Sequence, residues 1–146
     1  MMISTRGRYA LRILLDIAEY QKDGYVPLKD SAERQEISKK YLEQIVTIPG
    51  VSKMLEAKGG KCGGYRLARA PSDYTIGEVL RAAEGSLSPV TCLEENHSSC
   101  TRSSKCYVLP IWKGLDAVIN EYLDGMTLQD VLDQREGYDG GNDYVI

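Results

Sequence analysis

Apolar side chains recur at helical spacing near the start of this chain of 146 residues. Ser4 can cap the helix, and the pattern continues to about Tyr20. Its apolar positions are Ala10, Leu11, Ile13, Leu14, Ile17 and Ala18. Arg6, Arg8 and Arg12 lie in the first turns, where positive charge opposes the helix dipole. Because a broken local rule often marks a functional residue, we interpret them as phosphate contacts; the alternative is that they are solvated surface arginines.

Two shorter helices are predicted next, joined by a tight turn. Pro27 opens the first, which extends to about residue 36, and Ser38 can cap the second, over residues 39–46. This arrangement is typical of a helix-turn-helix, whose second helix enters the major groove of DNA by its N-terminal end. The residues that we expect to face DNA are Ser38, Lys39, Lys40, Tyr41, Glu43 and Gln44. The pattern alone is not specific, because many helical hairpins share it without binding DNA.

A glycine-rich segment follows and predicts a β-hairpin. Four of the six residues 59–64 are glycines, and short apolar segments flank them. A basic hairpin after two short helices is typical of the wing of a winged helix, which would bring Lys58, Lys61 and Arg66 to DNA phosphates. The segment is not a P-loop, because neither Lys-Ser/Thr nor a helix follows it.

The second half of the chain predicts three more helices. Residues 75–83 begin with a capping box and continue as a helix. A long amphipathic helix is expected over about residues 106–123, and a short last helix, capped by Thr127, over residues 127–133. The remaining residues, 134–146, become rich in Gly and Asp, and we expect a mobile tail.

The long helix carries a wide apolar stripe. The stripe consists of Val108, Ile111, Trp112, Leu115, Val118, Ile119 and Tyr122. A chain of this size has little other surface to cover it, so we expect the helix to pair with its copy in a homodimer; the alternative is that it packs back on its own domain. The predicted fold class is mainly α with a small β-hairpin wing. Its parts are a winged helix-turn-helix domain (1–84), a cysteine-rich segment (85–107), a dimerisation helix with the final short helix (108–133), and the tail (134–146).

Charge is unevenly distributed along the chain. Residues 1–70 hold 13 Lys and Arg against 8 Asp and Glu, a balance of +5, whereas residues 71–146 hold 5 against 13, a balance of −8; together they give the net charge of −3. A basic first half favours contact with an anionic polymer such as DNA, although chance asymmetry would look the same. No signal peptide and no membrane-spanning stretch is apparent, so we expect a cytoplasmic protein.

Three cysteines, Cys92, Cys100 and Cys106, lie in a polar segment with the spacing C-x7-C-x5-C. Cytoplasmic thiols stay reduced, so their grouping favours metal or redox chemistry over a structural disulfide. Thiolates suit both iron–sulfur clusters and zinc. Because zinc sites usually have closer C-x2-4-C pairs, which this segment lacks, we favour an iron–sulfur cluster.

Three thiolates leave one coordination position unassigned. His97 is the only histidine and lies between two of the cysteines, although a histidine in a loop is more often simply solvated. Glu94, Glu95 and Cys62 are further candidates, as are water and a small thiol. An open position makes a cluster labile, as a sensor requires. An enzyme is not expected, because no nucleophile has a neighbouring base and no cofactor fingerprint is present.

Several motifs together resemble the IscR-type (Rrf2) winged-helix regulators of bacteria. They are the opening over residues 3–12, Ile37-Ser38, residues 41–44, Gly63-Gly64-Tyr65, Thr75-Ile76, Ala83-Glu84-Gly85, and the three-cysteine segment before a helix that carries the only tryptophan. No single motif is decisive, but their order and spacing together are specific. The resemblance covers about residues 1–133.

The resemblance implies a homodimeric transcription factor, expected to be a repressor, that binds double-stranded operator DNA. It also implies that Cys92, Cys100 and Cys106 hold an iron–sulfur cluster, 2Fe–2S or 4Fe–4S, whose state sets DNA affinity. Members of the family sense iron, cluster supply, redox state or nitric oxide, and others lack the cysteines. The cysteine spacing is most similar to that of the iron-responsive branch from rhizobia.

The chain departs from the family pattern at several positions. Gly59 stands where an arginine often precedes the wing glycine, Lys53 stands where glycine is usual, and Pro49-Gly50 should end the recognition helix early. The fourth ligand of cluster-assembly sensors, a histidine, corresponds to Leu109, and that of nitric oxide sensors, an aspartate, corresponds to Arg8. Two alternatives therefore stay open: a cluster-free thiol- or metabolite-sensing repressor, and a zinc-stabilised interaction protein.

Overall fold

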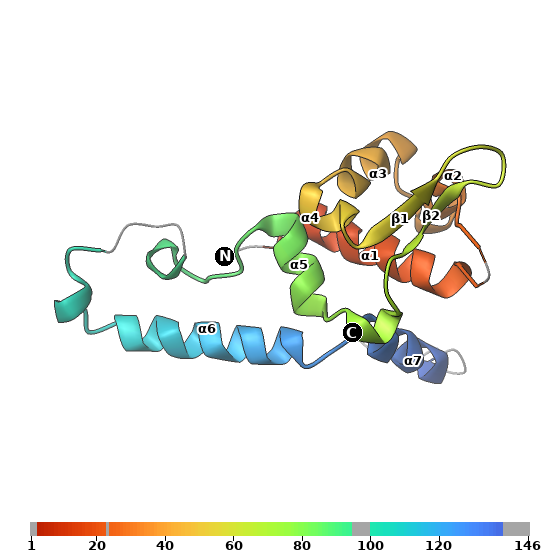
Figure 1. Cartoon of the computed structure of the whole chain (residues 1–146). Helices are drawn as coiled ribbons and strands as arrows, with labels where there is room; N and C mark the ends of the chain where they lie inside the picture. Colours follow the sequence, from red (N-terminus) through yellow and green to blue (C-terminus); the bar gives the residue numbers. More distant parts are fainter. Residues whose placement is uncertain (1–2, 23, 95–99, 139–146) are drawn as a thin grey trace.

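Helix α1 (Thr5–Tyr20) is the central element of the fold. A computed structural model of the chain describes residues 3–22, 24–94 and 100–138. The inner face of α1 is fully buried through Ala10, Ile13, Leu14 and Ile17. The elements that pack on α1 are α2 (Leu28–Gln35), α3 (Lys39–Val46), α5 (Ile76–Glu84), α7 (Leu128–Tyr138) and strand β2 (Gly64–Leu67). Figure 1 shows α3 on one side of α1 and α7 on the opposite side.

Helices α2 and α3 form the predicted helix-turn-helix. The turn between them is made by Glu36, whose φ of 54° places it in the left-handed region, and the backbone N–H of Glu36 donates to the last turn of α2. Ser38 then caps α3, because its Oγ accepts a hydrogen bond of 3.3 Å from the backbone nitrogen of Tyr41. Both bounds of α3 agree with the prediction. Its end at Val46 is followed by a new turn, α4 (Pro49–Ser52), which Pro49 begins.

The predicted hairpin consists of β1 (Leu55–Lys58) and β2, which pair antiparallel from Leu55 opposite Leu67 to Lys58 opposite Gly64. The backbone of Tyr65 also exchanges two hydrogen bonds of 2.8 Å with Val26, which ties the hairpin to the segment before α2. Leu67 is the one residue of the hairpin that is fully inside the core. The hairpin is therefore anchored at its base, while its tip projects beyond α2 (Figure 1).

Helix α7 returns to the winged-helix half and is longer than predicted. Thr127 and Asp130 cap it reciprocally: Thr127 Oγ1 accepts from the nitrogen of Asp130 at 3.0 Å, and Asp130 Oδ2 accepts from the nitrogen of Thr127 at 2.9 Å. Leu128 is completely buried in the core, and α7 continues to Tyr138 instead of ending near residue 133. Of the expected mobile tail, residues 134–138 are thus helical, and 139–146 lie outside the described residues.

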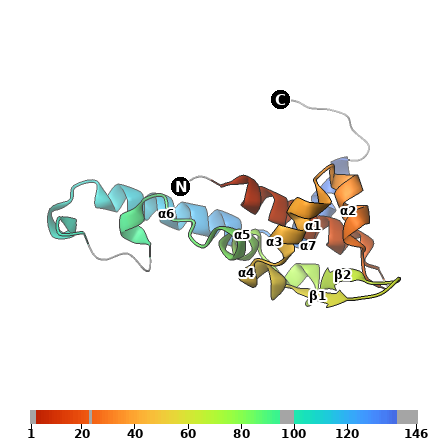
Figure 2. The same ribbon diagram turned by 90° about the horizontal axis from the view of Figure 1, so that it is seen from above.

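Helix α6 (Leu109–Asp124) extends away from the rest of the molecule, as both views show (Figures 1 and 2). It begins three residues later than the predicted start at Cys106. The cause is Pro110, which has no backbone N–H and is tolerated only in the first turn of a helix. No residue of α6 is buried, and only its C-terminal end, through Leu123, packs against the core. None of the described helices combines the length and the apolar character needed to cross a membrane.

Candidate nucleic-acid interface and cysteine segment

Helix α3 turns its polar face to solvent. Leu42, Ile45 and Val46 are buried in the core, which fixes the rotation of the helix. The predicted DNA-facing residues Ser38, Lys39, Lys40, Glu43 and Gln44 are consequently exposed, and Tyr41 is half-buried. Lys39 and Glu43 lie one turn apart, with Nζ and Oε1 separated by 3.7 Å. Both side chains are more than half exposed, so this pair contributes little to stability and leaves both groups available to a ligand.

A groove of about 450 Å³ runs between α1 and the start of α3. Tyr9 forms part of its wall and meets the ring of Tyr41 edge-on, with ring centroids 5.5 Å apart. Lys40 and Gln44 line the same groove. Tyr9 is not among the predicted contact residues, although its place on the first helix, one turn before Arg12 and Ile13, is a visible signal.

The arginines of α1 divide into two groups. Arg6 and Arg8 are exposed in the first turn, and Arg8 donates to Thr5 Oγ1 at 3.1 Å. Arg12, which we also expected to contact phosphate, is exposed as well, but its guanidinium has partners within the protein. Its guanidinium donates to the backbone oxygen and to Oε1 of Gln35, and it lies 5.2 Å from the ring centre of Tyr9. Arg12 thus binds the carbonyl at the end of α2, and its predicted phosphate contact stays a prediction.

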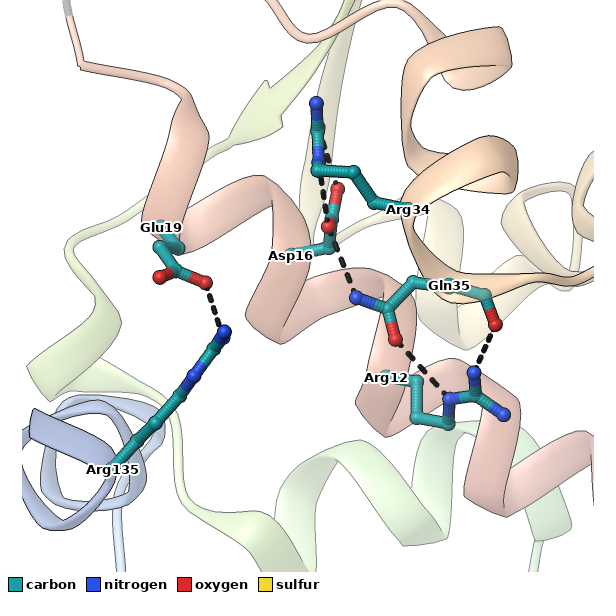
Figure 3. A network of polar contacts seen from close by, with 6 residues as sticks. All are labelled: Arg12, Asp16, Glu19, Arg34, Gln35 and Arg135. Atoms are coloured by element: carbon teal, nitrogen blue, oxygen red, sulfur yellow. Dashed lines mark hydrogen bonds and ion pairs between the residues drawn. The ribbon is translucent and has the colours of Figure 1, made fainter. Parts of the chain in front are cut away.

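Arg12 belongs to a polar network that joins α1 to α2 (Figure 3). Asp16, whose side chain is fully buried, accepts hydrogen bonds of 3.0 and 2.8 Å from Arg34 and one of 3.0 Å from Gln35. Burial alone would raise the pKa of Asp16, but the hydrogen bonds from Arg34 and Gln35 and the positive charge of Arg34 lower it. The guanidinium of Arg34 also lies 3.9 Å from the ring centre of Tyr20. This network fixes α2 relative to α1.

The basic residues of the hairpin surround one aromatic ring. Arg66 pairs with Glu56 at 2.7 Å on the neighbouring strand and lies 4.7 Å from the ring centre of Tyr25, and Lys58 lies 5.6 Å from the same ring. The hydrogen bond from Arg66 to Glu56 raises the pKa of Arg66. Lys61 is exposed at the tip. The hairpin thus presents the predicted cations to solvent, and Arg66 is already partnered.

The cysteine segment leaves α5 directly and ends before α6. Cys92 lies in a short 3-10 turn, η2 (Thr91–Leu93), and Cys106 follows another, η3 (Ser103–Lys105). All four cysteines are free thiols; Cys62, Cys92 and Cys100 are exposed and Cys106 is half-buried. Among the described residues, no group of three or more Cys, His, Asp or Glu side chains is placed to hold a metal ion. His97 and Glu95 lie outside the described residues, and Glu94 is half-buried at the start of the segment.

Helices α5 and α6 are joined by a side-chain contact that the sequence did not indicate. Arg81 donates to both carboxylate oxygens of Asp124, at 2.8 and 2.9 Å, and to Asn120 Oδ1 at 2.8 Å. The hydrogen bond from Arg81 lowers the pKa of Asp124. A polar cavity of about 470 Å³ lies beside this contact and is lined by Glu94 and Asp116 as well as by Arg81. The contact places the start of the cysteine segment next to the end of the long helix.

A second unpredicted contact links α5 to the first turn of α1. Ser4 occupies the N-cap position, as expected, but its side chain makes no capping bond to α1. The carboxylate of Glu84 takes that role and accepts a hydrogen bond of 2.9 Å from the backbone nitrogen of Gly7. Glu84 is 77 residues away from Gly7 along the chain, so no local sequence signal could reveal the pair.

Comparisons with known proteins agree with this architecture. The model of the Rrf2 family, described as iron-dependent transcriptional regulators, matches residues 3–134. The protein rrf2 of Nitratidesulfovibrio vulgaris is 37% identical over 90% of this chain and 87% of its own length. The regulator IscR of Aliivibrio salmonicida is 32% identical over 93% of this chain and 80% of its own.

Solved structures of regulators superpose on most of the chain. CymR, the global cysteine regulator of B. subtilis, is 31% identical with a TM-score of 0.74, covering 92% of this chain and 98% of its own. IscR of T. potens is 32% identical with a TM-score of 0.73, and the match covers 99% of this chain and 95% of the IscR chain. The chain therefore belongs to the Rrf2 family of winged helix-turn-helix transcriptional regulators, which are DNA-binding proteins and not enzymes.

Proposed function

We propose that this chain is a homodimeric, cytoplasmic repressor whose affinity for operator DNA is set by an iron–sulfur cluster held at Cys92, Cys100 and Cys106. The observation that carries the proposal is the position of the three free thiols. They lie in the segment that connects α5 of the winged helix to α6, so that a change in this segment acts on both. The family description and the likeness to IscR proteins support the choice of iron.

The donor set suits such a cluster by its chemistry. Thiolates are the usual ligands of iron–sulfur iron, and three free thiols separated by polar residues can converge without disrupting a core. A bound cluster supplies a redox-active and labile iron centre. The described arrangement does not gather the three thiols, so we infer that binding requires the segment to rearrange. The fourth ligand is unassigned; Glu94, Glu95 and His97 are the nearest candidates in sequence.

Contact with DNA is assigned to three exposed basic surfaces. Lys39, Lys40 and the polar face of α3 would enter the major groove, where Gln44 and Glu43 can reach base edges. Ser38 and Tyr41 stand at the same end of α3. Lys58, Lys61 and Arg66 on the hairpin, and Arg6 and Arg8 on α1, would contact phosphates.

Dimerisation is assigned to α6, because five apolar side chains along it and at its start are exposed in the described part of the chain. Val108, Ile111, Leu115, Val118 and Tyr122 are between 43% and 66% exposed. They recur at alternating intervals of three and four residues, which is the seam of a coiled coil. A second copy of the same helix satisfies this pattern by two-fold symmetry.

Anaerobic reconstitution with iron and sulfide tests the proposal. We expect a coloured protein with visible absorbance, bound iron and bound sulfide, and loss of all three in a Cys92→Ala variant. Cys62→Ala is the matched control, since it also removes an exposed cysteine but lies on the hairpin. It should retain the colour, and loss of colour would instead make Cys62, one of the candidates for the fourth position, a ligand. A wild-type protein that stays colourless and iron-free after reconstitution would refute the proposal.

The likeness to CymR supports a second candidate, a thiol-based repressor without a cluster. The exposure of Cys92 and Cys100, and the lack of a gathered metal site among the described residues, favour this reading. The same experiment separates the two. Protein purified anaerobically without iron or sulfide, whose DNA affinity nevertheless changes on mild thiol oxidation, would identify the second function.

A further inference from the structure

The carboxylate of Glu84 holds together the first turn of α1. Its Oε1 accepts hydrogen bonds from the backbone nitrogen of Ser4 at 3.1 Å, from Ser4 Oγ at 2.5 Å and from the backbone nitrogen of Gly7 at 2.9 Å. The first N–H groups of a helix have no partner within the helix, so an outside acceptor is required. Glu84 therefore supplies from α5 the cap that Ser4 does not provide.

Charge makes this cap more important than an ordinary one. The first turn of α1 contains no acidic residue and carries Arg6 and Arg8, whose positive charges add to that of the helix dipole. The negative charge of Glu84 offsets both. Hydrogen bonds to an ionised acceptor are also stronger than those to a neutral one.

Close packing fixes the position of the contact. A Cβ atom at Gly7 would collide with Oε1 of Glu84, so the helix backbone approaches the carboxylate as closely as only glycine allows. One turn earlier on α5, Arg81 donates a hydrogen bond to Asp124 of α6. Ala82, the next residue, packs so closely on Gly50 of α4 that a side chain at Gly50 would collide with it. The last turn of α5 thus contacts α1, α4 and α6 within four residues.

The same turn is the point at which the cysteine segment begins. Glu84 is the last residue of α5, and Gly85, with a φ of 90°, turns the chain into the segment that carries Cys92. A rearrangement of the segment acts first on this glycine and hence on its neighbour Glu84. Displacement of the carboxylate releases the backbone of Ser4 and Gly7 and with it the turn that carries Arg6 and Arg8.

We propose that Glu84 is the positioning residue that transmits the state of the cysteine segment to the arginines of α1. Through its three hydrogen bonds it keeps the first turn of α1 in the arrangement that contacts DNA. This inference rests on the proposed function for the signal, but the contact itself does not depend on which group the cysteines hold.

The test compares Glu84→Ala and Glu84→Gln with the control Glu78→Gln. Glu78 lies on the same helix, and among the described residues its carboxylate pairs with Arg69 on the surface, at 3.5 Å. Operator affinity is measured for the metal-free and the reconstituted dimer with a duplex selected by the wild-type protein from random sequences. Amide hydrogen exchange at Gly7 is measured in parallel, because its N–H donates to Glu84 at 2.9 Å and therefore reports directly on the contact.

We expect the ratio of the two wild-type affinities to lie in the range of about 5 to 150, as for typical coupled sites. In Glu84→Ala this ratio should fall toward one and the Gly7 amide should lose protection. Glu84→Gln retains an acceptor but not the charge, and should be intermediate. Glu78→Gln should match the wild type in both measurements.

The outcomes separate the two proposals. If Glu84→Ala exposes the Gly7 amide but keeps the wild-type affinity ratio, Glu84 is merely structural and the inference is wrong. If the wild type itself has a ratio of one, the proposed function fails. In that case the positioning role stands only if Glu84→Ala weakens operator binding in both the metal-free and the reconstituted form while Glu78→Gln does not. If Glu84→Ala binds the operator as tightly as the wild type, the positioning role is wrong as well.

Discussion

Arg81 of α5 and Asp124 of α6 face each other through two parallel hydrogen bonds of 2.8 and 2.9 Å. This pair is the polar contact that fixes the direction in which α6 leaves the winged helix. Arg81 is 35% and Asp124 44% exposed, so solvent screens their attraction and the pair acts more on geometry than on stability.

Loss of the Arg81–Asp124 pair should therefore change α6 more than it changes folding. Asp124→Asn is expected to lower the free energy of unfolding by only about 0.5 to 1 kcal/mol, measured by urea denaturation. Glu56→Gln, which breaks the exposed pair with Arg66, is the control and should have a similarly small effect. A loss several times larger for Asp124→Asn would show that the pair is structurally essential.

Removal of Asp16 should destabilise the protein strongly. Its side chain is fully buried, and Asp16→Ala leaves the guanidinium of Arg34 and the amide of Gln35 without their acceptor. Breaking a buried ion pair from one side costs about 3 to 5 kcal/mol, which urea denaturation would resolve. Because Arg34 is 30% exposed, we expect the lower end of this range. A loss of unfolding free energy smaller than that of Asp124→Asn, which breaks an exposed pair, would contradict the assigned network.

Acid should weaken the fold through the same carboxylate. The pKa of Asp16 in the folded protein lies below its ordinary value of 3.8, so the unfolded chain binds a proton more readily than the folded one. Its stabilisation is present above pH 3.8 and is lost as the pH falls from there through the folded pKa. Unfolding free energies measured across this acid range should decline less steeply in Asp16→Asn. An equal slope would mean that other carboxylates cause the decline.

A charge on the exposed seam of α6 should dissociate the dimer. Val118→Glu places a carboxylate where the two helices are expected to meet, and an unpaired charge there is costly. Sedimentation at micromolar concentration should then give the mass of a monomer. Ala117→Glu introduces the same group at the adjacent exposed position, outside the seam, and should remain a dimer. Equal behaviour of both variants would place the dimer contact elsewhere.

Two lysines at the start of α3 should dominate operator binding. Lys39→Ala combined with Lys40→Ala is expected to abolish specific binding to the operator. Where residual binding can be measured, the slope of log affinity against log salt concentration should correspond to about two fewer released counterions. Lys113→Ala, on the long helix, removes a lysine far from α3 and serves as the control. Normal operator affinity in the double variant would mean that α3 is not the recognition helix.

Local signals in the sequence predicted most of the winged helix. Ser38 caps α3 through the nitrogen of Tyr41, three residues away, and Gly59, Gly60 and Gly63 lie at the hairpin tip. Such features depend on neighbours along the chain and can therefore be recognised in it. The apolar stripe predicts a start of α6 that is three residues too early, whereas Pro110, which is also a local signal, marks the true first turn.

Contacts between distant residues could not be predicted in the same way. Glu84 and Gly7, and Arg81 and Asp124, are joined only when the chain has folded. The partner of Arg12 could not be predicted either, because Gln35 lies 23 residues away along the chain. For the cysteines, the sequence gives the donor types and their spacing, but the geometry of a bound cluster depends on a group that the chain alone does not contain.

The path of the chain around α5 has a consequence for evolution. The chain leaves the winged helix after Glu84 and returns at Met126, whose backbone oxygen accepts a hydrogen bond of 2.8 Å from Ile76 at the other end of the same helix. The two ends are thus separated by only the nine residues of α5, about 14 Å. Closing a loop between fixed ends costs only about 0.6 kcal/mol for each doubling of its length. The part of the chain between these ends can therefore change in length at little cost to the winged helix, as long as Leu87 and Leu123 keep their places at the core.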